Sequence, residues 1–188
     1  MKGVDVSIFN GVVDWRTLKA NGIDFAICRT GFGKYGCDET FARNIHDAQA
    51  EGLICGAYHY SYALTPADAA QEAEFCKHII NDTGCLLELP VFFDMEDADN
   101  WKARHDFDFS RRNVTMVCQS FIDNIRPLIC GIYASYSWLE QLIDWRSLNC
   151  PVWNAQWGPY DFIQGYLWQY TDKLFINGRQ FDANILRS

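Results

Sequence analysis

The stretch Pro90-Val91-Phe92-Phe93-Asp94-Met95-Glu96-Asp97 passes from a continuous apolar run into two acids that stand two residues apart. Apolar runs without a clean polar alternation are typical of parallel strands that are covered on both faces. Parallel strands are joined by long crossovers, which are usually helices. The stretch therefore favours an α/β fold and places the two acids at the carboxyl end of a strand.

The same kind of strand recurs through the first two-thirds of the chain and alternates with helical patterns. Asp14 and Thr65-Pro66 are typical helix starts, and Gly22 and Gly52 are typical stops. The expected strands cover residues 3–9, 25–30, 54–62, 89–95 and 129–135. The expected helices cover about residues 14–21, 39–51, 65–81, 110–125 and 138–143. Five successive β/α units indicate either a doubly wound sheet or a barrel.

The last third of the chain changes this rhythm. Three more strands are expected at residues 152–157, 166–171 and 180–186, with only about eight residues in each gap. Such gaps are shorter than a parallel crossover, so antiparallel connections are expected. Five β/α units followed by three strands that lack full helices predict a shortened β/α barrel of eight strands, because a complete barrel usually needs about 250 residues. We expect residues 1–188 to form a single domain.

Composition and charge narrow the class of protein. The chain is 49% hydrophobic and 21% charged, as is usual for globular proteins, and its formal net charge is −8. Binding to nucleic acid is not expected, because phosphates are bound by clustered Lys and Arg. No apolar run approaches the length of a membrane span, and the first residues lack the pattern of a secretory signal peptide.

The eight cysteines show neither a C-x-x-C motif nor a zinc-type spacing with the four scattered histidines. Cys28, Cys55 and Cys130 lie in apolar strand runs, and Cys76 and Cys118 lie in helical patterns. Buried free cysteine behaves as a small hydrophobic residue. We therefore expect reduced thiols, synthesis in a reducing compartment, no metal site and no cofactor.

Acidic residues at the ends of strands are the candidates for catalysis. Side chains two apart on a strand share a face, so Asp94 and Glu96 are expected to point the same way. Two neighbouring carboxyls raise one pKa, and a protonated acid beside an ionised partner suits cleavage of a glycosidic bond. Taken alone, the pair is also compatible with a simple strand end. Asp5 and Asp182 lie in the first and last strands, which become neighbours if the barrel closes, so all four acids are expected at one mouth.

Here the sequence resembles a known family, glycoside hydrolase family 25, and the resemblance spans essentially the whole chain in order. The family comprises muramidases found among bacteriophage endolysins and bacterial autolysins. The matching motifs are Asp5-Val6-Ser7 with Gly11 and Asp14-Trp15, Gly56-Ala57-Tyr58-His59, Asp94-Met95-Glu96, Gly131-Ile132-Tyr133, Trp153-Asn154-Ala155-Gln156, Leu167-Trp168-Gln169-Tyr170-Thr171 and Phe181-Asp182-Ala183-Asn184.

The resemblance implies a flattened barrel of five β/α units plus three strands, and a catalytic domain over the whole of residues 1–188. It also implies cleavage of the β-1,4 bond between N-acetylmuramic acid and N-acetylglucosamine in bacterial peptidoglycan. Glu96 matches the family's general acid. Asp94 matches the assisting carboxylate, which either orients the 2-acetamido group of the substrate or activates water, and Asp5 and Asp182 match the supporting acids.

The resemblance further implies that aromatic and amide side chains contact the sugar. These are Tyr58, Tyr133, Trp153, Gln156 and Gln169. Trp157 departs from the family pattern, which more often has tyrosine there, and this leaves the detail of the sugar subsites open.

Three other residues are given structural or surface roles. We expect His59 to be a hydrogen-bonded structural residue. Arg29 and Lys34, beside Gly31 and Gly33, could meet acidic groups of a substrate at a loop, but a solvated loop is favoured.

Two other functions remain open at this point: a chitinase-like N-acetylhexosaminidase and a non-catalytic wall-binding barrel. The site of action implied by the resemblance is the cell wall, reached outside the cell or at lysis after synthesis in the cytoplasm.

Overall fold

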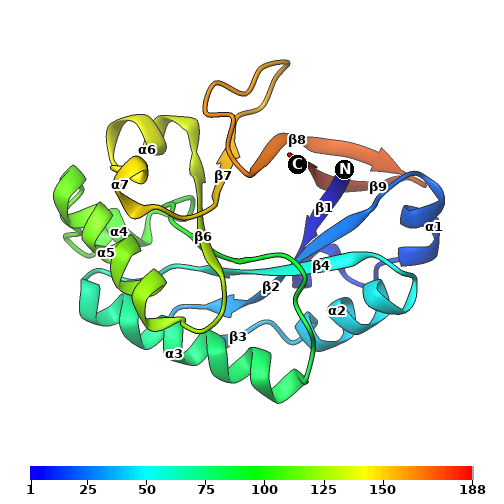
Figure 1. Ribbon diagram of the computed structural model, residues 1–188, viewed down its shortest axis with the longest axis horizontal. Helices are drawn as coiled ribbons and strands as arrows, with labels where there is room; N and C mark the ends of the chain where they lie inside the picture. The colour runs from blue at the N-terminus through cyan, green and yellow to red at the C-terminus, as the bar shows by residue number, and fades with distance from the viewer. Residues whose placement is uncertain (188) are drawn as a thin grey trace.

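The computed structural model describes residues 1–187, whose strands form one sheet in the order β1-β9-β8-β7-β6-β5-β4-β2-β3. A further pairing of β1 with β2 closes this sheet into a barrel, from which only the short β3 is left out (Figure 1). The strands are β1 (Lys2–Val6), β2 (Phe25–Phe32), β3 (Gly36–Cys37), β4 (Ile54–Tyr60), β5 (Val91–Asp94), β6 (Cys130–Ser135), β7 (Val152–Ala155), β8 (Leu167–Ile176) and β9 (Arg179–Leu186). The helices are α1 (Trp15–Ala20), α2 (Phe41–Ala50), α3 (Pro66–Thr83), α4 (Trp101–Arg104), α5 (Arg111–Asn124), α6 (Tyr136–Gln141) and α7 (Trp145–Leu148).

The predicted β/α barrel of eight strands is confirmed. Strands β1, β2, β4, β5 and β6 are mutually parallel and each is followed by at least one helix. The last three strands, β7, β8 and β9, have no helix between them. Figure 1 shows the consequence: α2, α3 and α5 cover one side of the barrel, whereas the ribbon of β8 and β9 has no helix outside it.

Helix boundaries follow the capping signals in the sequence. The Asp14 carboxylate accepts a hydrogen bond from the Thr17 amide at 3.0 Å, which starts α1. Thr65 and Asp68 form a reciprocal capping box at the start of α3, with Pro66 in the first turn. Gly84 ends α3 at φ 63°, a left-handed conformation that glycine adopts without a steric penalty.

The two-residue period of the strands separates an inner from an outer core. On β2, Ala26 and Cys28 face outward and pack within the main cluster beneath the helices. Phe25 and Ile27 face inward and join a separate cluster inside the barrel with Phe92, Trp153, Leu167 and Leu186. The barrel interior is narrow, since a side chain on Gly3 would collide with the ring of Phe25.

The expected antiparallel connection between the sixth and seventh barrel strands is wrong, because β7 and β8 are parallel. Strand β7 ends at Ala155 and β8 begins at Leu167, so the connection is longer than the sequence pattern indicated. It first runs beside β8, where the Gly158 amide donates to the Tyr170 carbonyl, and then turns around the buried Asp161. This loop projects from the barrel at the top of Figure 1. The connection of β8 to β9 is antiparallel, as expected.

The other differences are local. The first strand ends at Val6 rather than at residue 9, because Ser7 and Asn10 cap a short 3-10 helix, Ile8–Asn10. Three short elements were not expected from the sequence: β3, α4 and α7. None contains more than four residues, which is too short to show a clear hydrophobic period.

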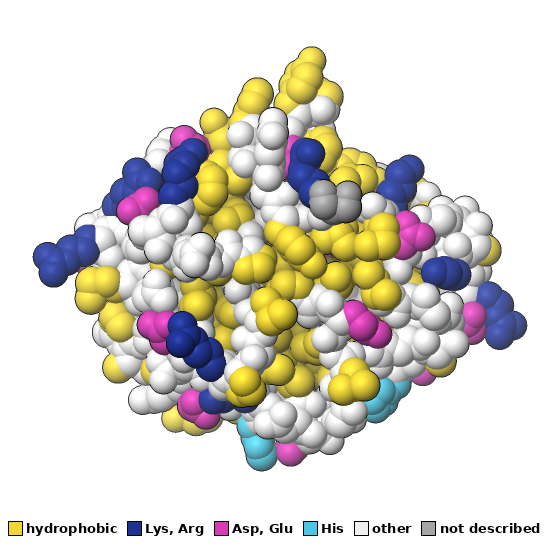
Figure 2. Space-filling model, in the orientation of Figure 1, with side chains coloured by type: hydrophobic (Ala, Val, Ile, Leu, Met, Phe, Trp, Pro, Cys, Tyr) yellow, Lys and Arg dark blue, Asp and Glu magenta, His cyan; other side chains and the backbone are white. Residues whose placement is uncertain are grey.

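Within residues 1–187, none of the helices combines the length and the apolar character that a membrane span requires. The sulfurs of all eight cysteines are free thiols. On the face shown in Figure 2, hydrophobic side chains gather near the middle, and most Lys and Arg side chains lie toward the outline.

Candidate active site

A cavity of about 390 Å³ opens where the parallel strands end. Its walls come from the strand ends and from the segment that follows β1. The lining residues are Asp5, Val6, Ser7, Phe9, Asn10, Arg29, Tyr58, Tyr60, Asp94, Glu96, Tyr133, Trp153, Gln169, Gln180 and Asp182. All four predicted acids are among them, so barrel closure brings the first, third and last sequence motifs together.

Asp94 and Glu96 share the cavity because the strand period continues past the end of β5. Asp94 is the last residue of β5 and lies in register with Tyr60 on β4 and Tyr133 on β6. Between the two acids, Met95 is buried in the outer core, and its amide donates to the Tyr133 carbonyl at 2.9 Å. The side chains before and after Met95 therefore both line the cavity.

Asp5 and Asp182 are direct cross-strand partners on β1 and β9. Oδ2 of Asp5 accepts hydrogen bonds from the amide groups of Asn184 at 2.7 Å and Gln169 at 3.1 Å. Burial nevertheless outweighs these bonds and raises the pKa of Asp5 to about 6. Burial, followed by the charge of Asp5, raises the pKa of Asp182 to about 8. Near neutral pH, Asp5 is therefore the ionised member of this pair and Asp182 the protonated one.

Burial is also the main cause that raises the pKa values of Asp94 and Glu96. Asp94 is only 4% exposed, Oδ1 of its carboxyl group is buried without a hydrogen-bond partner, and the charge of Glu96 raises its pKa further. The expectation of an ionised partner beside a protonated acid thus fits Asp5, with its two amide donors, better than it fits Asp94.

Lys102 partly offsets these shifts and was not predicted from the sequence. It lies on α4, is fully buried, and its ammonium group donates to the backbone carbonyls of Ser61 and, at 2.8 Å, Glu96. Its charge lowers the pKa values of both Asp94 and Glu96. A helix of four residues is too short to show a hydrophobic period, so no pattern in the sequence indicated that this lysine is buried.

Aromatic residues form the floor and walls of the cavity. Trp153 is 1% exposed, and its ring meets those of Tyr58 and Tyr133 edge to face at centroid distances of 6.1 and 4.6 Å. Its indole N–H donates to Oδ1 of Asn184 at 2.8 Å. Tight packing and a satisfied polar atom hold these rings in fixed positions.

The two predicted glutamines have different places. Gln169 lines the cavity, and its side-chain oxygen accepts hydrogen bonds from the Tyr133 hydroxyl at 3.1 Å and the Trp157 indole at 3.2 Å. The structure does not bring Gln156 to the cavity lining. Its side-chain oxygen instead accepts from the amides of Asn154 and Phe162 and so fixes the loop after β7.

His59 and Lys34 lie away from the cavity lining. His59 is fully buried on the outer face of β4, and its ring nitrogens are 2.9 Å from the Thr30 hydroxyl and from the Gly33 carbonyl. Burial lowers the pKa of its imidazole to about 4, which fits the expected structural role. Lys34 forms an ion pair with Asp68 at 2.9 Å.

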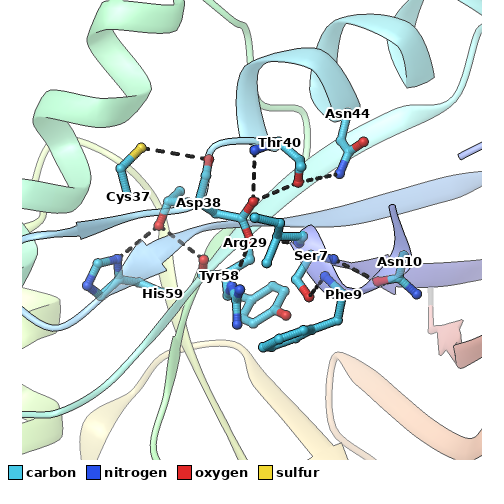
Figure 3. Close-up of polar contacts among 12 residues, drawn as sticks. Ser7, Phe9, Asn10, Arg29, Cys37, Asp38, Thr40, Asn44, Tyr58 and His59 are labelled. Atoms are coloured by element: carbon cyan, nitrogen blue, oxygen red, sulfur yellow. Dashed lines mark hydrogen bonds and ion pairs between the residues drawn. The ribbon is translucent and has the colours of Figure 1, made fainter. Parts of the chain in front are cut away.

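The expectation that Arg29 lies in a solvated loop is wrong. Arg29 is on β2, is 9% exposed, and pairs through Nε with the buried Asp38 at 2.8 Å (Figure 3). Asp38 comes from the turn after β3, which the sequence pattern did not reveal, so the partner that makes burial of Arg29 possible was not visible. Other lining residues missed from the sequence are Ser7, Phe9, Asn10, Tyr60 and Gln180.

No cluster of three or more His, Cys, Asp or Glu side chains suited to hold a metal ion is found in residues 1–187. The cavity combines four carboxyls with raised pKa values and an aromatic floor, and the buried Lys102 lies next to its lining, on the Glu96 carbonyl.

The chain matches the model of the family described as Glycosyl hydrolases family 25 over residues 4–179. It is 25% identical to "Lysozyme M1" of Streptomyces globisporus, with 98% of this chain and 66% of that protein covered. It is also 25% identical to the "Autolytic lysozyme" of Clostridium acetobutylicum, with 98% of this chain and 55% of that protein covered. The chain thus spans between about half and two thirds of the length of these relatives.

A solved structure agrees with this relationship. The crystal structure of the CTP1L endolysin superimposes with a TM-score of 0.84 at 25% sequence identity, and the match covers 99% of this chain and 66% of that one.

Proposed function

This chain belongs to glycosyl hydrolases family 25, and from that premise we propose that it is a muramidase that hydrolyses bacterial peptidoglycan. The bond cleaved is the β-1,4 bond between N-acetylmuramic acid and N-acetylglucosamine. The observation that carries the proposal is the meeting of Asp5, Asp94, Glu96 and Asp182 in one cavity with raised pKa values. Such a cluster is costly to bury and is suited to moving protons near neutral pH.

The names of the relatives support the same reading. Two are lysozymes, one of them autolytic, and the related crystal structure is that of an endolysin. We propose that residues 1–188 act as one catalytic domain and that their site of action is the cell wall.

Glu96 acts as the general acid that protonates the leaving oxygen. Its pKa is raised by burial, so its carboxyl group retains a proton at a higher pH than an exposed glutamate does. It is also less buried than Asp94, and it lines the cavity, where a glycosidic oxygen can reach it.

Asp94 is the assisting carboxyl group. Since no hydrogen bond from residues 1–187 reaches its side chain, it is open to a donor from the substrate or to a water molecule. In its ionised form, which the charge of Lys102 favours, it orients the 2-acetamido group as an internal nucleophile or activates water, and either route is compatible with the same fold. Asp5 and Asp182 support the pair by setting the local charge.

The sugar packs on the aromatic floor. Tyr58, Tyr133 and Trp153 present ring faces and edges, and Gln169 is held at the cavity wall by its bonds to Asp5 and Tyr133. Apolar faces of sugar rings bury well against such side chains, while the polar edges select the orientation.

Analysis of new reducing ends tests the proposal. Purified peptidoglycan is digested, the products are reduced with borohydride, and the amino-sugar alcohols are identified; chitin serves as the second substrate. We expect muramitol from peptidoglycan and little release from chitin. Glucosaminitol from peptidoglycan, or cleavage of chitin at a comparable rate, would instead indicate an N-acetylhexosaminidase. If neither peptidoglycan nor chitin gains new reducing ends, the protein is a wall-binding barrel.

A further inference from the structure

Arg29 is the one positively charged side chain among the residues that line the cavity, within the part of the chain that the structure describes. The same lining contains the four carboxyls, so the cavity opposes the entry of an anionic ligand. Binding of a negatively charged ligand in this cavity is therefore favoured only beside Arg29.

The contacts of Arg29 leave part of its guanidinium group available. Its Nε donates to Oδ2 of Asp38, which also accepts from the Ile8 amide at 2.9 Å (Figure 3). The other oxygen of Asp38 accepts from the amide and hydroxyl of Thr40 at 2.9 and 2.6 Å. The carboxylate is thus fully occupied and holds only one edge of the guanidinium. The two terminal nitrogens form no hydrogen bond with residues 1–187, although a guanidinium has five donors.

Two aromatic rings fix the plane of this group. The guanidinium carbon lies 5.0 Å from the ring centroid of Phe9 and 5.8 Å from that of Phe32. Phe9 is 87% exposed, so its ring stands at the mouth of the cavity rather than in the core. The ion pair on one edge and the two neighbouring rings restrict the guanidinium group, and its free edge remains available to a planar carboxyl group.

A role for Arg29 as a simple counterion of the catalytic acids explains less. Its side chain forms no hydrogen bond or ion pair with any of the four carboxyls in the described structure. The charge of Lys102 lowers the pKa of both Asp94 and Glu96, whereas the charge of Arg29 lowers only that of Asp94, and by less than Lys102 does. The terminal nitrogens of Arg29 are therefore not committed to the carboxyl cluster.

We propose that Arg29 recognises the carboxyl-derived oxygen of the lactyl group on N-acetylmuramic acid, and so distinguishes this sugar from N-acetylglucosamine. This inference rests on the proposed muramidase function and adds a specificity-determining residue to it. The lactyl group carries a carboxylate on bare glycan strands and an amide carbonyl where a peptide is attached. Both accept hydrogen bonds from a guanidinium, and the carboxylate also gains from its charge.

The test compares two forms of one oligosaccharide. The first is an alternating tetrasaccharide of N-acetylglucosamine and N-acetylmuramic acid with free lactyl carboxylates; in the second, these carboxylates are reduced to alcohols. A third, peptide-bearing form separates the amide from the carboxylate. The variants are Arg29→Gln and Arg29→Lys. Glutamine removes the charge, whereas lysine keeps a positive charge beside Asp38 and so preserves the fold if the glutamine variant does not fold. Arg43→Lys, at an exposed position on α2, is the matched control.

For the carboxylate substrate, we expect kcat/KM to fall about tenfold in Arg29→Lys and up to about 100-fold in Arg29→Gln, the range for one hydrogen bond to a charged group. For the reduced substrate, the change should stay within about threefold. A smaller loss on the peptide-bearing form would show that charge, and not only the carbonyl oxygen, is recognised.

Equal losses on all substrates would show that Arg29 acts only through the fold and would overturn the proposal, as would a wild-type enzyme indifferent to reduction of the carboxylate. If the wild-type protein cleaves none of the substrates, the proposed function fails instead. Titration calorimetry with the same two tetrasaccharides then still decides the role of Arg29. A preference of the wild-type protein for the carboxylate that weakens in Arg29→Lys supports the proposal, and no preference overturns it.

Discussion

The barrel interior has two regions that are built from the same strands but differ in chemistry. Two residues along β2, Ile27 gives way to Arg29, and two residues along β5, Phe92 gives way to Asp94. The lower region is a closed apolar cluster, whereas the upper region lines a cavity with carboxyl, amide and phenol groups. Strand geometry is the same in both, so the difference lies entirely in the side chains.

This contrast separates stability from function. Burial of apolar surface in the lower region stabilises the fold by about 25 cal/mol per Å². In the upper region, buried carboxyl groups have pKa values raised by desolvation, which means that their ionisation opposes folding. Groups that lower stability are retained where activity requires them.

The largest effect on stability should come from the lower region. Phe92 is fully buried and packs edge to face against Trp153 at a centroid distance of 5.3 Å. Phe92→Ala should lower the free energy of unfolding by about 3–5 kcal/mol, because it leaves a cavity in a closed cluster. Phe175→Ala, at a position 65% exposed on β8, is the control and should stay within about 0.5 kcal/mol. Equal effects in chemical denaturation would mean that the inner cluster does not support the barrel.

An effect of the opposite sign, which depends on pH, is expected at Asp182. Its pKa is about 8 in the folded state and near 3.8 without the fold, so the native state binds more protons between these values. Its contribution to stability is therefore complete below about pH 4 and is lost as the pH rises through about 8. Asp182→Asn should unfold at a higher temperature than wild type at pH 8.5, with little difference at pH 4. The exposed Asp82→Asn should show no such divergence, and a variant less stable at pH 8.5 would refute the assignment.

Asp5 should shift the pH profile of activity. Its negative charge is among the causes that raise the pKa of Glu96, after burial. The alkaline limb of wall lysis reports an acid that must stay protonated, which we assign to Glu96. Asp5→Asn should therefore move that limb to lower pH, whatever its effect on the maximal rate. Asp123→Asn, on the exposed side of α5, provides the control; a limb that stays in place or rises would mean that Asp5 and Glu96 are not coupled.

Addition of a reductant should have no effect on the stability of the protein. All eight are free in the structure, and burial raises the pKa of the Cys28 thiol well above its ordinary value, which disfavours the reactive thiolate. Millimolar reductant should leave the melting temperature unchanged. A native disulfide typically contributes about 2–4 kcal/mol, so a clear drop on reduction would contradict the expectation of a reducing compartment for synthesis.

Much of the fold was predictable because it depends on short-range periodicity. The apolar runs gave the parallel strands, and Asp14 and Thr65 marked helix starts that the structure confirms. The parallel pairing of β7 with β8 was not predictable, because β7 was expected to end two residues later and β8 to begin one residue earlier than they do, which made the gap between them too short. Its turn depends on the buried Asp161, whose partner Arg187 is distant in sequence.

The candidate site was predictable where one strand or barrel closure brings residues together. The two-residue period placed Asp94 with Glu96, and closure placed Asp5 opposite Asp182. The buried position of Arg29 and the presence of Lys102 could not be found in this way. Arg29 is buried only because Asp38 reaches it from an unforeseen hairpin, and Lys102 because backbone carbonyls surround its ammonium group.

The separation of the two regions is tested most directly by Glu96→Gln, with wall lysis and the free energy of unfolding measured on the same samples. Glutamine keeps the shape of the side chain but cannot protonate the leaving oxygen. Lysis should fall by a factor of about 10² to 10⁴, the usual contribution of general acid catalysis. The free energy of unfolding should be unchanged or higher, since a buried acid is removed, and the exposed Glu74→Gln should alter neither quantity. A Glu96→Gln protein that keeps more than about half of the wild-type lysis would contradict the account.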